Sequence, residues 1–406
     1  MKKIICFLML LYIFVSCTQN KNLLGEYNKE HVLIPTKTVS TSLDSTEYDI
    51  IDVIPLNLPP TIKNFKKSQI KWINGRIYIL DSEFNQALFV FDDKGNFIYK
   101  LGGKGHAKNE FIEKPTCFSI DKKTGDIHIY ERQSVKVLIF SSDGTFKESI
   151  NLRPLVPGSI ELLDNCNYLM CFESVSNGDG HKLAIYKKNK ELVKSLMDFT
   201  DDERLRLIDE PIFDDNDIVY NPLLSDSRIV ISGDTVKNVI KIDFDCEFNS
   251  EETMRQSLLK GKYEPIYKLK DGVQFISNVE MTDSLIHISY VYNMYECHFL
   301  KNRINNKVYN SLRYGFINGI MPTSIFTIKD NELVYLITED MINLVCSDND
   351  PNFWESIRKK TPSVMLDIID KKIKTPVIVT YKLKLKICYS FLCFLLWEHA
   401  QICRTK

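Results

Sequence analysis

Gly75–Asp81 reads GRIYILD and Leu88–Phe97 reads LFVFDDKGNF, and the pattern returns in Gly125–Glu131 (GDIHIYE) and Val137–Phe146 (VLIFSSDGTF). Each copy holds two apolar runs of strand length separated by a short polar stretch, which is the pattern of neighbouring antiparallel strands. The glycine in DDKGN and in SSDGT suits the positive φ of a tight turn, after which a further strand follows. The offset of about 50 residues is the size of one propeller blade.

An entry strand at Lys66–Ile73 or Pro115–Asp121 completes four strands in each copy. A four-stranded sheet has two faces to cover, and packing such sheets around an axis buries those faces and leaves only short edges. We therefore expect an all-β fold, a six-bladed β-propeller of four-stranded antiparallel blades. An ordinary β-sandwich that contains two similar hairpins is the alternative.

The later blades repeat the pattern less regularly. Their strands are predicted at Ser159–Leu163, Tyr168–Phe172, Lys182–Lys187 and Glu191–Met197, at Ile229–Ser232 and Val236–Phe244, at Val273–Val279, Leu285–Tyr292, Tyr295–Lys301 and Lys307–Ser311, and at Met321–Ile328, Leu333–Thr338 and Pro376–Tyr381. A helical insertion is predicted in the last blade over Asp350–Lys371, because Pro351 suits a first helical turn and apolar residues follow at helical spacing.

The ends of the chain are predicted to meet in one blade. Tyr48–Leu56 alternates like a strand, and we expect it to complete the last blade beside Pro376–Lys384. Joining both ends in one sheet would close the ring, since a circular array needs its last blade to pack on its first.

The N-terminus has the features of a bacterial secretion signal. Residues 1–16 contain a basic start and an apolar run of about a dozen residues, too short to span a bilayer. The signal ends before Cys17 in a sequence that resembles a lipobox, so Cys17 is the predicted lipidation site; a plain signal peptide is the alternative. Residues 17–47 are polar and are predicted to be a lipidated N-terminus and flexible tether, followed by the propeller at 48–384.

Several motifs together resemble a known family. Leu101–Phe111 (LGGKGHAKNEF) looks like the connection between blades of NHL-type propellers, and Phe91-Asp92 with Gly95 and the closing Pro376–Lys384 (PVIVTYKLK) match as well. With the lipobox, the chain resembles the six-bladed β-propeller lipoproteins of gut Bacteroidota. That resemblance implies architecture and a place in the cell envelope, because the biochemical role of the family is largely undefined.

The sequence departs from this family at its C-terminus. Residues 385–406 continue past the closing strand and include Ile387–Trp397 (ICYSFLCFLLW). Such a run is shorter than the about 20 residues that a membrane-spanning helix needs. We expect an atypical apolar tail outside the fold, and a peripheral membrane contact is the alternative.

Composition narrows the class of partner. The formal net charge is −1, and the body between the basic ends is mildly acidic, which argues against a nucleic-acid partner. Eleven cysteines include Cys6 in the signal and Cys17. Of the remaining nine, Cys166 and Cys171 are predicted to lie on one strand and to face opposite sides, and buried free thiols are expected rather than disulfides.

The glycine-rich connection supplies the candidate ligand-binding residues, namely His106, Lys108 and Glu110. A phosphate-binding loop is excluded here, because no Ser or Thr follows the lysine in the required place and the next segment is a predicted strand. Connections between blades lie on one rim near the axis, so these three side chains could contact a ligand held over the central channel.

Other site motifs fail on spacing. Phe213–Ile218 (FDDNDI) lacks the ligand and the glycine of an EF-type calcium loop, and Cys297-His298 lacks zinc-site partners. A nucleophile elbow of the G-x-S-x-G kind is absent. No catalytic residue, metal or cofactor is therefore predicted.

Two functions remain open. The first is a membrane-anchored binding or scaffold module for a glycan, a peptide or an envelope protein, and the alternative is a propeller hydrolase or lyase acting on carbohydrate or peptide at the central funnel. Because Thr18–Asn22 contains no acidic residue, we expect an outer-membrane lipoprotein that faces the periplasm.

Overall fold

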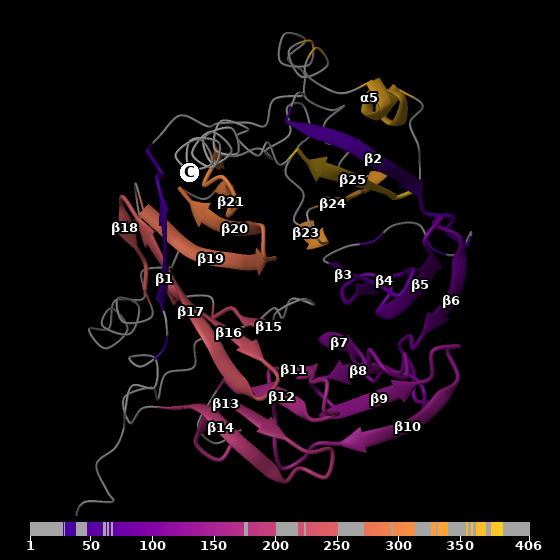
Figure 1. Ribbon diagram of the computed structural model, residues 1–406. Coiled ribbons are helices and arrows are strands. Elements are labelled where there is room, and N and C mark those ends of the chain that lie inside the picture. Colours follow the sequence, from indigo (N-terminus) through magenta and orange to yellow (C-terminus); the bar gives the residue numbers. More distant parts are fainter. Residues whose placement is uncertain are drawn as a thin grey trace, which may run out of the picture.

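The computed structural model of the chain contains six small β-sheets arranged in a ring (Figure 1). It describes residues 27, 29–37, 47–59, 62, 65, 68–173, 178–199, 218–222, 225–250, 272–293, 295–312, 326–329, 332–339, 355, 359, 363–370 and 375–384. Each sheet is one blade, so the chain is a six-bladed β-propeller, as the sequence predicts.

The first three blades follow one another along the chain, each with its strands paired in sequence order from the axis outward. They consist of β3 (Ser68–Ile73), β4 (Arg76–Asp81), β5 (Ala87–Asp92) and β6 (Phe97–Leu101); of β7 (Cys117–Ile120), β8 (Ile127–Glu131), β9 (Lys136–Phe140) and β10 (Phe146–Asn151); and of β11 (Ser159–Leu162), β12 (Tyr168–Cys171), β13 (His181–Tyr186) and β14 (Leu192–Asp198).

Among the last three blades, the fourth and the sixth each take an outer strand from the N-terminal part of the chain. They consist of β15 (Ile218–Tyr220), β16 (Ser227–Ser232) and β17 (Thr235–Phe244) with β1 (Lys29–Ile34); of β18 (Glu247–Phe248), β19 (Gly272–Met281), β20 (Leu285–Tyr292), β21 (Tyr295–Asn302) and β22 (Val308–Leu312); and of β23 (Phe326–Lys329), β24 (Glu332–Ile337) and β25 (Val377–Leu383) with β2 (Tyr48–Pro55). The fifth blade thus has a short extra strand, β18, which pairs in parallel with β19.

The repeated turns have the chemistry that the sequence predicts. Gly95 and Gly144 occupy equivalent turns with φ of +81° and +89°. Gly95 also lies against the closing strand, where an added Cβ would overlap the carbonyl oxygen of Pro55. Glycine is therefore required at this position both for the turn and for the approach of the last blade.

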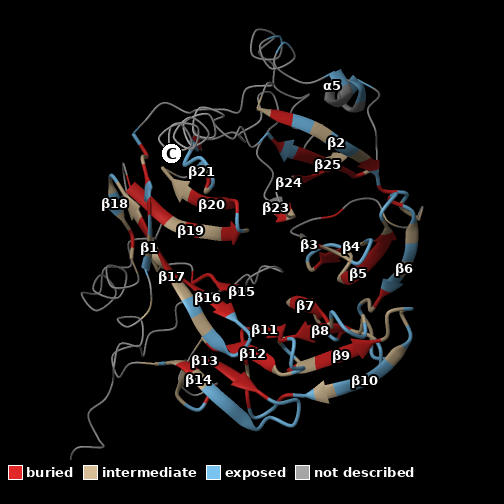
Figure 2. Ribbon diagram, viewed as in Figure 1, coloured by how far each residue is buried: buried red, intermediate tan, exposed pale blue. Residues whose placement is uncertain are grey.

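The hydrophobic core is divided among the gaps between blades. Each of the six clusters of buried side chains is built from two neighbouring blades, and the six together close the ring. Inner strands are mostly buried, whereas outer strands such as β10 are mostly exposed (Figure 2). The blades are thus held together by apolar faces packed on each other, which is the expected arrangement for a propeller.

The predicted closure is confirmed. β2 pairs antiparallel with β25, from Tyr48 opposite Leu383 to Pro55 opposite Val377. Side chains from β2 and β25 then pack on the first blade in one of the six clusters, which includes Ile54, Leu56 and Ile378. The N-terminal strand therefore joins the last blade to the first.

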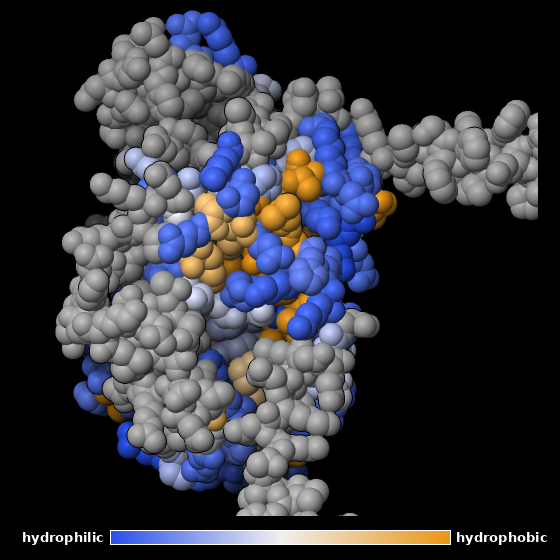
Figure 3. All heavy atoms as spheres, turned by 90° about the vertical axis from the view of Figure 1, so that its left-hand side faces the viewer, coloured by the Kyte–Doolittle hydropathy of each residue, from blue (hydrophilic) through white to orange (hydrophobic). Residues whose placement is uncertain are grey.

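Part of the predicted tether is instead a strand. The sequence predicts a flexible tether over 17–47, and this is wrong for Lys29–Ile34, which forms β1 and pairs in parallel with the outer side of β17. The burial of Val32 and Ile34 in the core between the fourth and fifth blades explains the difference. Apolar side chains are visible among polar ones on the side of the molecule that carries β1, where Leu33 is 64% exposed (Figure 3).

The helical insertion predicted over Asp350–Lys371 is not seen as one unit. Within the described residues, α5 (Ser363–Asp370) is a short helix between β24 and β25. Most of the preceding part of the insertion lies outside the described residues, as do the predicted signal 1–16, Cys17 and the tail 385–406. None of the helices in the described part has the length and apolar character that crossing a membrane requires.

Closure by β2 leads to a test of stability. Replacing Ile54, which is 7% exposed, with Ala should lower the free energy of unfolding by about 2–5 kcal/mol, because it leaves a cavity between the last and first blades. Ile51→Ala on the same strand is the matched control: this side chain is 40% exposed, and its truncation should cost less than about 1 kcal/mol. Urea unfolding measures both, and equal losses would contradict the closure.

Candidate functional site

The connection between β6 and β7 carries all three predicted ligand-binding residues. Neighbouring strands of a blade run in opposite directions, so this connection lies at the same end of the blades as the turn between β4 and β5. We call this end of the ring the connection rim. It is the rim on which the sequence places a ligand.

Backbone hydrogen bonds give the connection a defined shape. The N–H of Phe111 donates to the carbonyl of Gly103 (2.9 Å), and the N–H of Gly105 donates to the carbonyl of Phe111 (2.8 Å). The Phe111 side chain is fully buried in the core between the first and second blades. The loop is therefore anchored at its base by packing and closed by its own backbone.

Glu110 stabilises this loop through hydrogen bonds to the backbone of Ala107. Its Oε2 atom accepts a hydrogen bond from the N–H of Ala107 (2.9 Å), and its own N–H donates to the Ala107 carbonyl (3.1 Å). A side chain at Gly105 would overlap the Glu110 carboxylate, so the glycine leaves the space that this contact needs. Glu110 is thus occupied in positioning the loop, which the sequence did not predict.

His106 and Lys108 take the opposite orientation. Both are exposed, as is Lys104, and none of the three has a hydrogen bond or ion pair within the described residues. The structure therefore places His106 and Lys108 on one shaped loop at the connection rim. Their contact with a ligand remains a prediction.

The neighbouring turn between β4 and β5 was missed by the sequence reasoning. Asp81 is fully buried, and its carboxylate accepts the backbone N–H groups of Glu83, Phe84 and Asn85 at 2.9–3.2 Å. An aspartate that bonds the N–H groups just after it is a common turn signal, and it was available in the sequence. The carboxylate of Glu83 in this turn forms an ion pair with Lys114 of the connection (2.8 Å).

A buried ion pair crosses the region near the axis. Lys71 of β3 and Glu161 of β11 approach to 3.2 Å (Nζ to Oε2), with side chains only 7% and 10% exposed. They come from the first and third blades, so the pair passes the innermost strand of the second, where the Lys71 ammonium lies 5.4 Å from the centroid of the Phe118 ring. Replacing either Lys71 or Glu161 alone would strongly destabilise the fold, because the remaining charge would be buried without its partner.

The family model for "Domain of unknown function (DUF4934)" matches residues 45–365. The chain belongs to this family. No curated protein matches the sequence. The match begins just before β2 and ends within α5, so the DUF4934 region includes β2 to β24, whereas β1 of the fourth blade and β25 of the last blade lie outside it.

The comparison with solved structures shows the fold of this DUF4934 chain in a further protein. A Bacteroides fragilis protein described as exported has a TM-score of 0.70 at 15% identity, with 88% of this chain and 99% of that chain covered. A member of the DUF4221 family from Bacteroides vulgatus has a TM-score of 0.49 at 9% identity, with 84% and 99% covered. At 15% identity, the similarity to the Bacteroides fragilis protein concerns the fold alone. The NHL-like and lipoprotein features expected for the DUF4934 chain stay predictions.

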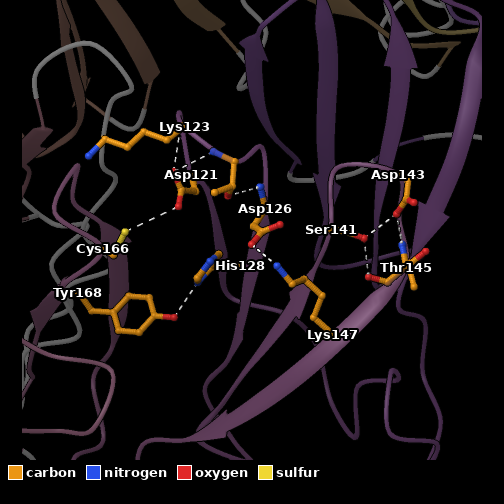
Figure 4. A network of polar contacts seen from close by, with 11 residues as sticks. Asp121, Lys123, Asp126, His128, Ser141, Asp143, Thr145, Lys147, Cys166 and Tyr168 are labelled. Atoms are coloured by element: carbon orange, nitrogen blue, oxygen red, sulfur yellow. Dashed lines mark hydrogen bonds and ion pairs between the residues drawn. The ribbon is translucent and has the colours of Figure 1, made fainter.

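A small hollow lies at the opposite rim, between the turns that follow β7 and β11. It has a volume of about 200 Å³ and is lined by Ile120, Asp121, Lys122, Lys123, Leu162, Leu163 and Asp164. Figure 4 shows that Asp121 is already engaged: it accepts the Lys123 N–H (2.8 Å), and the thiol of Cys166 lies 3.8 Å away. Burial favours a higher pKa for Asp121, but the hydrogen bonds from Lys123 and Thr124, with a smaller contribution from His128, together outweigh it and lower the pKa.

The size and occupancy of this hollow limit its use. Ligand pockets usually begin at about 300 Å³, so it is small for a substrate.

Cys166 has φ of +64° and lies in the turn before β12, not on that strand as predicted. The five cysteines among the described residues are free thiols: Cys117, Cys171 and Cys297 are buried, as the sequence predicts, whereas Cys166 is exposed and Cys246 is half-buried, which the sequence does not predict.

Two stacked histidines are buried in the fifth blade. Nε2 of His287 (β20) lies 3.2 Å from Nδ1 of His298 (β21), and the rings are 5.4 Å apart and nearly parallel. Burial lowers the pKa of His298 to about 4. The Glu280 carboxylate is 3.7 Å from His287, yet burial and the neighbouring ring hold the pKa of His287 well below its ordinary value. Among the described residues, no group of three or more His, Cys, Asp or Glu side chains is arranged to hold a metal ion.

Acid should therefore destabilise the fold. Both rings are neutral when folded and take up protons when unfolded, so the free energy of unfolding should fall as pH drops from about 6.5 towards 4, by on the order of several kcal/mol. Denaturation at a series of pH values measures this. A His287→Leu/His298→Leu double variant should lose much of the slope, whereas His106→Asn, which changes an exposed ring, should keep it. An unchanged slope in the double variant would show that this pair is not its source.

The loop geometry can be tested by amide hydrogen exchange. Glu110→Ala removes the acceptor for the Ala107 N–H, and exchange at that amide should rise about tenfold or more, because a hydrogen bond to a charged group is lost. Glu113→Ala removes a carboxylate from the same connection without removing this bond, so exchange should not change. Equal exchange in both variants would contradict the positioning role of Glu110.

Proposed function

We propose that the chain is an envelope lipoprotein whose propeller serves as a binding or scaffold module, with the connection rim as its contact surface. The observation that carries the proposal is the loop of residues 103–111, which is shaped by internal hydrogen bonds and holds His106 and Lys108 exposed. A loop already ordered before binding loses little conformational entropy when a partner is bound. The partner classes are a glycan, a peptide or another envelope protein.

The carboxylates at this rim favour binding over hydrolysis. Asp81 and Glu110 accept backbone N–H groups, and Glu131 accepts the N–H of Glu113 (2.6 Å) and the hydroxyl of Ser134 (2.6 Å). A general acid or base must reach the substrate with its carboxyl group. These carboxylates instead hold the rim loops in place.

The proposed localisation is the outer membrane, with Cys17 lipidated and the propeller facing the periplasm. The basic start, the apolar run and the lipobox-like sequence before Cys17 support it, and so does the exported description of the Bacteroides fragilis protein of this fold. The segment between Cys17 and Lys29 could reach at most about 40 Å. A lipid would therefore keep the outer edge of the fourth blade near the membrane. In this proposal the tail 385–406 lies outside the fold.

Membrane anchoring is tested by removing the thiol. Cys17→Ala should abolish labelling by a palmitate analogue and remove the protein from the outer-membrane fraction, whereas Cys6→Ala, within the signal, should leave both unchanged. Protease treatment of intact cells should spare the protein. Persistent lipid labelling of Cys17→Ala, or shaving from intact cells, would contradict the proposed anchor or its orientation.

Binding is tested by screening the purified full-length protein against arrays of glycans and peptides. Reversible binding of at least one class, with the probe recovered intact, is the expected result. Cleavage of a bound probe would favour the hydrolase or lyase alternative, and no binding to either array would contradict the module.

A further inference from the structure

Two exposed apolar side chains lie on the connection rim beside the cationic loop. Phe84, in the turn between β4 and β5, is 64% exposed, and Ile112, in the connection, is 42% exposed. Their neighbours Glu83 and Lys114 form an ion pair of 2.8 Å, which holds the turn and the connection together. Phe84 and Ile112 therefore belong to one surface, formed where the first and second blades meet.

The exposure of Phe84 is maintained by the turn that carries it. Three consecutive N–H groups, those of Glu83, Phe84 and Asn85, donate to the carboxylate of the fully buried Asp81. These hydrogen bonds to a buried charge, each worth about 1.5–3 kcal/mol, fix the backbone of the turn and keep Phe84 at its surface. The ring is thus held in solvent, where an aromatic side chain can act as an anchor for a partner.

Unpaired positive charge lies on the loop that leads to Ile112, at Lys104 and Lys108. The ammonium groups of Lys104 and Lys108 are exposed and have no hydrogen bond or ion pair in the described chain, whereas the carboxylate of Glu83 is paired with Lys114 and that of Glu110 accepts the Ala107 N–H. The surface therefore combines apolar anchors with cationic groups that are not neutralised by the protein itself. Such a surface is complementary to an acidic partner that has an apolar side chain.

We infer that this surface, made of Phe84, Ile112, Lys104, His106 and Lys108, binds an acidic segment of a protein or peptide. An apolar side chain of that segment covers Phe84 and Ile112, and its carboxylates face the two lysines. A polypeptide fits better than an acidic glycan, because two exposed apolar side chains, Phe84 and Ile112, are complementary to an apolar side chain, which a uronate-containing glycan lacks. The inference rests on the proposed function and specifies its partner.

The test uses the full-length protein and three immobilised probe sets. They are twelve-residue peptides with Asp and Glu around a central Leu or Phe, the same peptides with Lys and Arg in place of the acids, and uronate-containing oligosaccharides. Of the three probe sets, the wild-type protein should bind only the acidic peptides, and this binding should weaken as the salt concentration rises.

Two variants should weaken that binding at least about tenfold, namely Phe84→Ala and the double variant Lys104→Glu/Lys108→Glu. Controls are Ile98→Ala, a side chain 41% exposed on β6 of the same blade, and Lys94→Glu in the turn at the opposite rim. Both controls should bind as the wild type does. Urea unfolding should show that all four variants remain folded, since each changed side chain is exposed.

The outcomes separate this inference from the proposed function. Acidic-peptide binding that is unaffected by Phe84→Ala or by the charge reversal overturns the inference and leaves a binding module that uses another surface. Binding of the uronate oligosaccharides alone overturns the peptide partner while the module stands. Failure of the wild-type protein to bind any probe overturns both.

Discussion

The whole structure depends on packing between the faces of neighbouring blades. An isolated four-stranded sheet would expose both faces, and its apolar side chains are removed from water only when a blade lies on each side. Five of the six interfaces can form between blades that follow one another in the chain. The sixth, between the last and first blades, includes Ile54 and Leu56 from the N-terminal side of the first blade. Closure therefore turns a row of sheets into a ring in which every blade has two neighbours.

The repeat is the part of the fold that the sequence predicts best. Turn glycines and alternating apolar runs are local signals, so the strands of the first two blades and the closing strand β2 could be placed from sequence alone. β1 could not, although Val32 and Ile34 alternate in the manner of a strand. Its partner β17 is more than 200 positions away, and nothing local indicates which outer edge accepts a parallel strand. Two-residue β18 is too short to leave a pattern.

The candidate site was predictable to the same extent. A glycine-rich connection between two strands marks an exposed loop, so His106 and Lys108 could be proposed. The role of Glu110 was missed because its partner is a backbone N–H group, which has no sequence signature. Lys71 and Glu161 are 90 positions apart, and only the curvature of the ring brings them together. Contacts that depend on ring geometry become visible only in three dimensions.

Carboxylates at the connection rim organise the backbone, and this division of labour determines what the rim can do. Asp81 and Glu110 each accept N–H groups from their own turn or loop, and these hydrogen bonds fix the loop shape. Because Asp81 and Glu110 bind backbone N–H groups and Glu83 is paired with Lys114, the exposed side chains left without a partner on the loop include Lys104 and Lys108. Asp81 and Glu110 are thus committed to the loop backbone, and the shaped loop presents its lysines beside the exposed Phe84 and Ile112. Such a surface is suited to recognition, since its geometry is set before any partner arrives.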